Sequence, residues 1–224
     1  MIDSQTRLMK MSDINPCVDI HMQAFQGFFL TFLGPAFLKE LYSSILVDPS
    51  GIGLVIERGG QIRGFVIGTQ QPAGLYSRLL RQRWWAFGLA SIGPLLRNPK
   101  ILTRLLRAFR KPNEKSDVAN CGTLMSIAVL PEEQGKSAGK QLVTAFLGRA
   151  RQCGLSYVNL TTDALDNVSA NRFYQKMGFE LTRTFLTPEN RQMNEYMICL
   201  QQASQPSKRA IEPPVRSISV STIE

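Results

Sequence analysis

Residues 131–147 read PEEQGKSAGKQLVTAFL, and this stretch decides how the rest of the chain is interpreted. It follows a strand-like apolar run over 123–130 and leads into an apolar helical pattern. A helix N-terminus presents unpaired N–H groups and partial positive charge, both of which suit a phosphate group. The stretch therefore predicts a phosphate-binding turn, unless its small residues serve only the packing of the helix start.

A nucleotide-binding P-loop is the first alternative, because residues 135–137 read GKS. A P-loop requires G-x-x-x-x-G-K-[ST], which would place its first glycine at position 130. That residue is Leu130, so the P-loop is rejected. The small residues are instead interpreted as keeping the backbone amides within reach of a ligand, while Lys136 and Lys140 add positive charge.

A second motif follows over residues 167–179, which read NVSANRFYQKMGF. Together the two motifs resemble the GCN5-related N-acetyltransferase (GNAT) superfamily, which carries [QR]-x-x-G-x-[GA] and then N-x-x-A-x-x-[FY]-Y-x-x-x-G-F. Residues 134–139 fill the first motif, with Ser137 where the first glycine is usual. The second is matched at Asn167, Ala170, Phe173, Tyr174, Gly178 and Phe179. The resemblance covers roughly residues 5–200. It implies a mixed α/β fold of the α+β type, with a mostly antiparallel central sheet flanked by helices.

The resemblance implies acetyl-CoA as co-substrate, no metal, and a splayed strand whose backbone binds the pantetheine arm. Tyr174 matches the tyrosine that protonates the leaving thiolate, and a phenol has a suitable acidity for that role. The alternative for Tyr174 is an aromatic side chain that packs beside Phe173. The implied cofactor-binding residues are Ile127, Ala128, Val129, Gln134, Gly135, Lys136, Ser137, Ala138, Gly139, Lys140, Asn167 and Phe173.

The general base and the acceptor pocket are less well defined by the sequence. No carboxylate lies between Ser126 and Leu130, so Asp163 or Asp166, a water chain or a partly neutral acceptor all stay open as routes for the proton, and O-acetylation stays open too. Asp166 is equally a candidate for the N-cap of the following helix. The side chains expected around the acceptor are Thr123, Asp163, Asn194 and Tyr196. The single histidine, His21, lies in an apolar helical stretch and is predicted to pack in that helix rather than to act as a catalyst.

Hydrophobic periodicity and turn residues predict the element order around these motifs. Residues 1–201 are expected to form one acyltransferase domain, and 202–224, rich in Ser and Pro, a disordered tail. The strands are expected at 6–11, 53–58, 61–70, 123–130, 155–162, 179–186 and 192–200, and the helices at about 13–25, 34–48, 138–153 and 167–177.

Residues 72–115, between the strands expected at 61–70 and 123–130, form a basic segment that is predicted to be a helical insertion. From Arg58 through Asn113 there are eleven basic residues and no acidic one, and arginines recur every three or four positions among Leu, Trp and Phe. The pattern predicts a pair of basic amphipathic helices. They are either a solvated pair with arginines outward and Leu and Trp inward, which caps the acceptor site or forms a dimer face, or a surface over 76–111 that contacts anionic lipid.

The numbers of charged residues and cysteines limit the partners and the cellular compartment that we expect for the protein. The 26 Lys and Arg residues against 17 Asp and Glu residues fit an anionic partner, although no nucleic-acid reader motif is present. Four well-separated cysteines without a C-x-x-C argue against zinc and favour a reducing cytoplasm.

We expect a cytoplasmic acyl-CoA-dependent acyltransferase, with peripheral contact to the inner membrane face as an option. The expected acceptor is a primary amine of a small molecule, an amino sugar among the candidates, and the expected assembly is a monomer or a homodimer. The alternative is a non-catalytic acyl-CoA-binding, membrane or nucleic-acid interaction module that uses the same fold.

Overall fold

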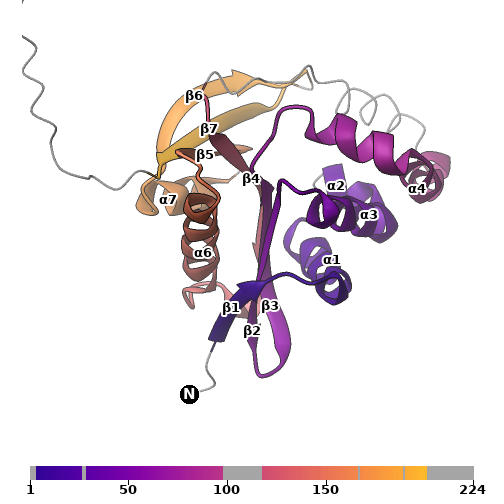
Figure 1. Ribbon diagram of the computed structural model, residues 1–224, viewed down its shortest axis with the longest axis horizontal. Helices are drawn as coiled ribbons and strands as arrows, with labels where there is room; N and C mark the ends of the chain where they lie inside the picture. Colours follow the sequence, from indigo (N-terminus) through magenta and orange to yellow (C-terminus); the bar gives the residue numbers. More distant parts are fainter. Residues whose placement is uncertain (1–3, 27–28, 98–117, 166, 189, 201–224) are drawn as a thin grey trace, which may run out of the picture.

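A single mixed sheet forms the centre of the protein, in a computed structural model that describes residues 4–26, 29–97, 118–165, 167–188 and 190–200. The seven strands lie in the order β1-β2-β3-β4-β5-β7-β6, and only the β4–β5 pair is parallel (Figure 1). This confirms the mostly antiparallel mixed α/β fold. The strands are β1 Ser4–Leu8, β2 Gly51–Arg58, β3 Gln61–Thr69, β4 Cys121–Val129, β5 Tyr157–Asp163, β6 Glu180–Leu186 and β7 Gln192–Cys199.

Helices cover both faces of the sheet (Figure 1). On one face lie α1 Ile14–Ala24, α2 Phe29–Phe32 and α3 Gly34–Val47, and α4 Leu75–Arg97 packs against α3. The opposite face is covered by α6 Ala138–Gln152, and α7 Val168–Lys176 lies beside β5. Two short 3-10 turns, η1 Met11–Asp13 and η2 Pro131–Glu133, precede α1 and α6.

The apolar residues of the sheet divide into two cores. On β3, Phe65 and Ile67 pack into the core beneath α1 and α3, whereas Val66 between them packs into the core beneath α6. This alternation follows from the two-residue period of a strand, which sends neighbouring side chains to opposite faces. A strand whose apolar residues are consecutive, as in β3, is therefore buried on both sides and belongs in the middle of the sheet.

Residues that permit special backbone conformations mark the ends of the elements. Gly59 and Gly60, which join β2 to β3, have φ values of 59° and 75°, and Gly154 and Gly178 follow α6 and α7 with φ values of 78° and 88°. All four lie in the left-handed region that glycine tolerates. The first strand, expected at 6–11, ends instead at Leu8 because residues 11–13 form the η1 turn.

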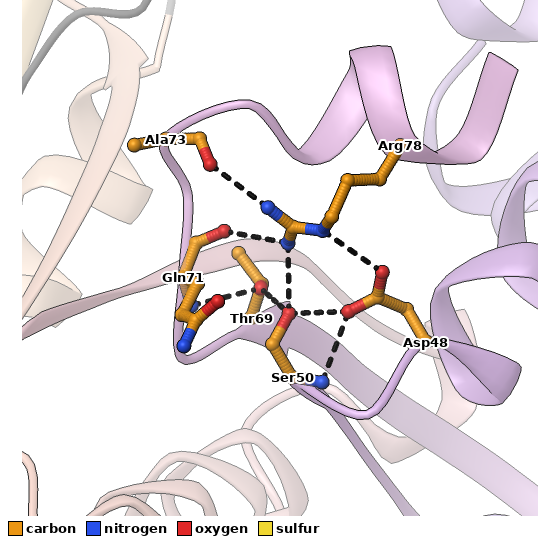
Figure 2. A network of polar contacts seen from close by, with 6 residues as sticks. All are labelled: Asp48, Ser50, Thr69, Gln71, Ala73 and Arg78. Atoms are coloured by element: carbon orange, nitrogen blue, oxygen red, sulfur yellow. Dashed lines mark hydrogen bonds and ion pairs between the residues drawn. The ribbon is translucent and has the colours of Figure 1, made fainter. Parts of the chain in front are cut away.

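The described part of the basic insertion is α4, and the second predicted helix lies outside the described residues. Figure 2 shows how the start of α4 is held by Arg78, whose guanidinium donates to Asp48 at the end of α3 (3.1 Å) and to Ser50 (3.1 Å). Burial alone would raise the pKa of Asp48, but hydrogen bonds from Ser50 and Arg78 outweigh burial and hold the pKa below its usual range.

The tryptophans of α4 do not face inward. Trp84 is 70% exposed and Trp85 is 55% exposed, whereas Phe87 is buried against Phe37 of α3 at 5.5 Å between ring centroids. The expectation of inward-facing tryptophans is therefore wrong within this chain. The helix backbone leaves helical geometry at Arg83, which pairs with Glu40 of α3 (2.7 Å).

Candidate functional site

The site begins where two neighbouring strands part. β4 and β5 pair in parallel only from Cys121–Thr123 to Tyr157–Asn159. At the last of these pairs the Thr123 hydroxyl donates to the side-chain oxygen of Asn159 (2.6 Å). Residues 124–129 of β4 and 160–163 of β5, which follow the last pair, all line one cavity. The strands therefore form a fork, and β4 presents to the cavity an edge whose backbone groups no strand pairs.

The cavity has a volume of about 720 Å³, which is in the range of sites for small molecules and cofactors. Its floor is the fork between β4 and β5, and one end is closed by the start of α6. The other walls come from α7, from the end of β5 and from α1. The lining residues from outside β4 and β5 include Gln134, Gly135, Ser137, Ala138, Gly139, Lys140, Asn167, Phe173, Tyr174, Arg191, His21 and Phe25.

Most of the predicted cofactor-binding residues thus meet in one place. Ile127, Ala128 and Val129 lie on the open edge of the fork, and the residues of the first motif except Lys136 lie at the start of α6. The first backbone bond of α6 runs from the N–H of Gln141 to the carbonyl of Ser137 (2.9 Å). The amides of residues 138–140 precede it and have no acceptor within the helix, which is the arrangement that binds a phosphate.

Space is left open above these amides. A Cβ atom built on Gly135 would meet no atom within 4 Å, and one built on Gly139 would meet only the Phe173 ring, at 3.6 Å. Gly135 has a φ value of 76°, so its glycine also serves the backbone conformation. Residues 134–140, which we call the cradle, therefore fit the pyrophosphate of acetyl-CoA. Lys140 lines the cavity beside it.

Ser137 departs from the usual glycine at the tightest point of the cradle. Its φ value is 65°, in the left-handed region that costs a non-glycine residue about 1 kcal/mol. Its side chain turns toward the exposed side of the helix, where its hydroxyl accepts a hydrogen bond from Gln141 (3.1 Å). Serine therefore occupies a left-handed backbone conformation that glycine adopts more easily.

A buried ion pair holds the turn that precedes the cradle. Glu133, at the end of η2, has a side chain that is 6% exposed, and both of its carboxylate oxygens accept from Arg58 on β2 (2.8 Å and 3.1 Å). Because Gln134 and Gly135 follow directly, the pair sets where the cradle sits relative to the sheet. The sequence did not predict it, since the partners are separated by 75 positions.

Tyr174 lies in the wall of the cavity and is largely buried. Its ring contacts Phe173, Phe179 and Tyr196 at centroid distances of 5.4, 5.8 and 6.3 Å. Burial raises the pKa of Tyr174 to about 12. The phenol therefore keeps its proton at neutral pH. The structure thus places Tyr174 both in the aromatic packing and at the site.

Asn171 organises this wall and was missed by the sequence reasoning. Its side-chain amide donates to the carbonyls of Asp163 and Asn167 (both 2.8 Å), and its oxygen accepts from Asn194 and Tyr196 (both 2.9 Å). The available signal was its spacing, because Asn171 is four residues after Asn167 and three before Tyr174, on one face of α7.

The residues predicted around the acceptor separate into two groups. Thr123, Asn194 and Tyr196 do not line the cavity in the described part of the chain; Thr123 closes the fork, and the other two bind Asn171. Asp163 does line the cavity, but its carboxylate binds the guanidinium of Arg191 (2.7 Å). A carboxylate held by an arginine is a poor proton acceptor, which weighs against Asp163 as the base.

The only histidine also lies at this site. His21 is 2% exposed and packs in α1 as predicted, yet it lines the cavity on the side opposite the cradle. The Tyr42 hydroxyl and Nδ1 of His21 are 2.6 Å apart. Burial lowers the pKa of His21 to about 4, so the imidazole is neutral at pH 7.

The comparisons with known proteins agree with this geometry. The profile of a family described as the acetyltransferase (GNAT) family matches residues 15–179. No curated protein matches the chain in sequence. Among solved structures, a ribosomal-protein alanine N-acetyltransferase from Escherichia coli superimposes with a TM-score of 0.57 and 14% identity, covering 91% of this chain and 97% of the other.

Two further solved structures are similar at comparable identity. The PaiA N-acetyltransferase from Thermoplasma acidophilum, in complex with coenzyme A, has a TM-score of 0.53 and 13% identity, with 87% of this chain and 98% of the other covered. A spermidine N-acetyltransferase chimera of Vibrio cholerae SpeG and hSSAT has a TM-score of 0.57 and 14% identity, with 88% and 95% covered. At these identities the likeness establishes the fold and nothing further.

Proposed function

Because the chain belongs to the acetyltransferase (GNAT) family of N-acetyltransferases, which use acetyl-CoA, we propose that it transfers the acetyl group to a primary amine of a small molecule. The observation that carries the proposal is the cavity at the fork of β4 and β5. It is lined both by the start of α6, with its unpaired amides, and by Tyr174. A cavity of this kind suits a long ligand that carries phosphates at one end and reacts at the other.

The residues of this cavity match the requirements of the reaction. Acetyl-CoA supplies a thioester; the amine nitrogen bonds to its carbonyl carbon, the carbon–sulfur bond breaks, and a thiolate leaves. Tyr174, whose phenol is protonated, would give its proton to that sulfur. The amine must lose one proton as it reacts, and with Asp163 held by Arg191 we assign that proton to water rather than to a carboxylate.

The cradle is tested by adding a negative charge to it. Gly139→Asp is expected to weaken acetyl-CoA binding at least about tenfold by calorimetry, because its carboxylate would repel the pyrophosphate. The fold should be kept, since an acidic residue in the first turn favours a helix and the added Cβ meets Phe173 only at 3.6 Å. The matched control is Gly148→Asp in the same helix, where a Cβ meets nothing within 4 Å and affinity should not change.

Turnover is tested by release of free thiol from acetyl-CoA in the presence of amino sugars, small primary amines and spermidine. We expect release that depends on both acetyl-CoA and an amine. Tight acetyl-CoA binding without release from any of these amines would contradict an enzyme of small amines and favour the acyl-CoA-binding module. Equal affinity of Gly139→Asp and the unchanged protein would contradict the cradle itself.

We also propose that α4 brings the protein to an anionic membrane surface, at the cytoplasmic face of the inner membrane. The exposed large apolar side chains of α4 include Trp84, Trp85, Leu89 and Ile92. Arg81 is exposed among them, and aromatic rings beside cationic residues are typical of helices that lie in the membrane interface. Among the described helices none is both long and apolar enough to cross a bilayer.

Membrane contact predicts co-sedimentation with vesicles of phosphatidylcholine and phosphatidylglycerol, and its loss in about 0.5 M salt. The double substitution Trp84→Ser and Trp85→Ser should abolish sedimentation. A control is Leu181→Ser with Leu186→Ser on β6, which removes two exposed apolar side chains (49% and 63%) outside α4. Unchanged sedimentation of the tryptophan variant would contradict the proposal. A variant whose oligomeric state changes while its vesicle binding does not would also contradict it, and would identify α4 as a dimer face.

A further inference from the structure

The cavity wall contains a buried polar group that the reaction described so far does not use. This is His21, on α1, which shares its wall with Phe25, Leu30 and Met125. These neighbours are apolar, and a buried imidazole among them is normally hydrogen-bonded at both nitrogens. The inference drawn here rests on the proposed N-acetyltransferase function and concerns the acceptor.

One nitrogen of the imidazole has a partner that sets its protonation. Tyr42 of α3 is buried and lies 2.6 Å from Nδ1, and its own oxygen interacts with the Ser126 hydroxyl of β4. A phenol is a stronger donor than a neutral imidazole, and the imidazole nitrogen is the stronger acceptor. The Tyr42 hydroxyl therefore donates to Nδ1, which leaves the proton of the neutral ring on Nε2.

The other nitrogen has no partner. Nε2 of His21 is buried and makes no hydrogen bond within the described part of the chain. A buried N–H donor without an acceptor is costly, and such groups cluster at functional sites. Because His21 lies in the cavity wall, the acceptor atom that Nε2–H lacks can be supplied by a molecule bound in the cavity.

The charged residues that line the cavity indicate which charges the bound molecule can carry. Two of the described lining residues are acidic, and both are held by arginines: Glu133 by Arg58 and Asp163 by Arg191. Recognition of a second ammonium group, as in a polyamine, requires a carboxylate that is not already paired in this way. The described walls therefore suit an acceptor whose remainder is uncharged.

We infer that Nε2–H of His21 donates a hydrogen bond to an oxygen of the acyl acceptor, so that the enzyme selects primary amines that bear a neutral oxygen close to the reacting nitrogen. Hydroxyl, ether and amide oxygens all qualify, and amino sugars and amino-acid amides belong to this class. Phe25 lies beside the imidazole, with the two ring centroids 4.6 Å apart, and lines the same cavity. His21 is thus a specificity-determining residue for the proposed reaction.

The protonation of His21 is directly measurable because the chain has a single histidine. In protein labelled with nitrogen-15 histidine, the NMR spectrum at pH 7 is expected to show one neutral ring, protonated at Nε2 and unprotonated at Nδ1. Saturation with coenzyme A and 2-methoxyethylamine should shift the Nε2–H resonance. A ring protonated at Nδ1 instead, or at both nitrogens, would overturn the inference whether or not the protein turns over any substrate.

Selectivity is measured with a pair of amines that differ by one atom. 2-Methoxyethylamine places an ether oxygen where butylamine has a methylene group, and we expect its kcat/KM to be about fivefold higher. The double variant His21→Leu with Tyr42→Phe removes both partners of the buried hydrogen bond and should lower that ratio to about one. His21→Gln, which offers an amide N–H near the position of Nε2, should restore part of it.

The controls separate this inference from the proposed function. The affinity for acetyl-CoA should be the same in both variants, because His21 lies across the cavity from the cradle. Absence of thiol release with every amine would contradict the proposed function and leave the NMR result to decide the state of His21. A ratio that stays at about five in the double variant, or a preference of the unchanged enzyme for spermidine, would overturn the inference itself.

Discussion

Replacing Tyr174 by Phe is expected to lower kcat by about a hundredfold while leaving the affinity for acetyl-CoA unchanged. The ring stays in its contacts with Phe173, Phe179 and Tyr196, so the wall of the cavity and the fold are preserved. What is lost is the one proton that the phenol would give to the leaving sulfur. The measurements are steady-state kinetics of thiol release and calorimetric titration with acetyl-CoA.

The pH dependence gives this prediction a second readout. Because burial raises the pKa of Tyr174 to about 12, the phenol is still protonated at pH 10, where an ordinary tyrosine is half ionised. Loss of the Tyr174 proton should therefore not lower kcat between pH 7 and 10. A decline that begins below pH 10 in the unchanged enzyme, and is absent in Tyr174→Phe, would mean that the phenol ionises in its ordinary range.

The matched control is Tyr157→Phe, which removes the hydroxyl of a β5 tyrosine that does not line the described cavity. We expect kcat to stay within about twofold of the unchanged enzyme. Full activity of Tyr174→Phe would show that Tyr174 is a packing residue, which is the alternative that the sequence left open. A fall in acetyl-CoA affinity together with kcat would instead indicate a damaged cavity.

Replacing Arg58 by Met is expected to cost about 3 kcal/mol in the free energy of unfolding, because Glu133 would remain as a buried carboxylate without its partner. The aliphatic part of the side chain is retained by Met, so little packing is lost. Acetyl-CoA should also bind about tenfold more weakly, since Glu133 precedes the cradle and its turn would no longer be tied to β2. Denaturant unfolding and calorimetry measure the two effects.

A more exposed ion pair of the same chemistry provides the comparison. Arg183 of β6 pairs with Glu195 of β7, and the two side chains are 51% and 13% exposed. Arg183→Met should cost less than about 1 kcal/mol, as exposed pairs do. The double variant Arg58→Met with Glu133→Leu should recover most of the lost stability but not the affinity. Equal losses for Arg58→Met and Arg183→Met would contradict a buried brace beneath the cradle.

Short sequence patterns were enough to predict several helix starts and turns. The two motifs predicted where α6 and α7 begin, because a helix start depends on residues within one turn. Gly59 and Gly60 predicted the hairpin between β2 and β3, since only a left-handed backbone closes so short a turn. The sequence also assigned Ser137 to the cofactor-binding motif, whereas its φ value of 65° became known only from the structure.

Contacts between distant segments were not accessible in this way. Thr123, Asn194 and Tyr196 were expected in the acceptor pocket, but Asn159 and Asn171 engage them instead. Helical spacing left two alternatives for Trp84 and Trp85, inward packing or a membrane-facing surface, and both side chains are exposed. Spacing assigns residues to the same face of a helix, and it does not decide which face the rest of the protein covers.

The amino-acid sequence alone therefore determined the family, the order of elements and the cradle for the diphosphate, because each depends on hydrogen bonds and backbone angles of adjacent residues. Only the tertiary structure decided that Arg58 pairs with Glu133 before the cradle, that Asn171 organises the wall, and that His21 lines the cavity with Nε2 unpartnered among the described residues. The reason is physical: burial and pairing are set by atoms that the chain brings together from far apart, and no local pattern records them.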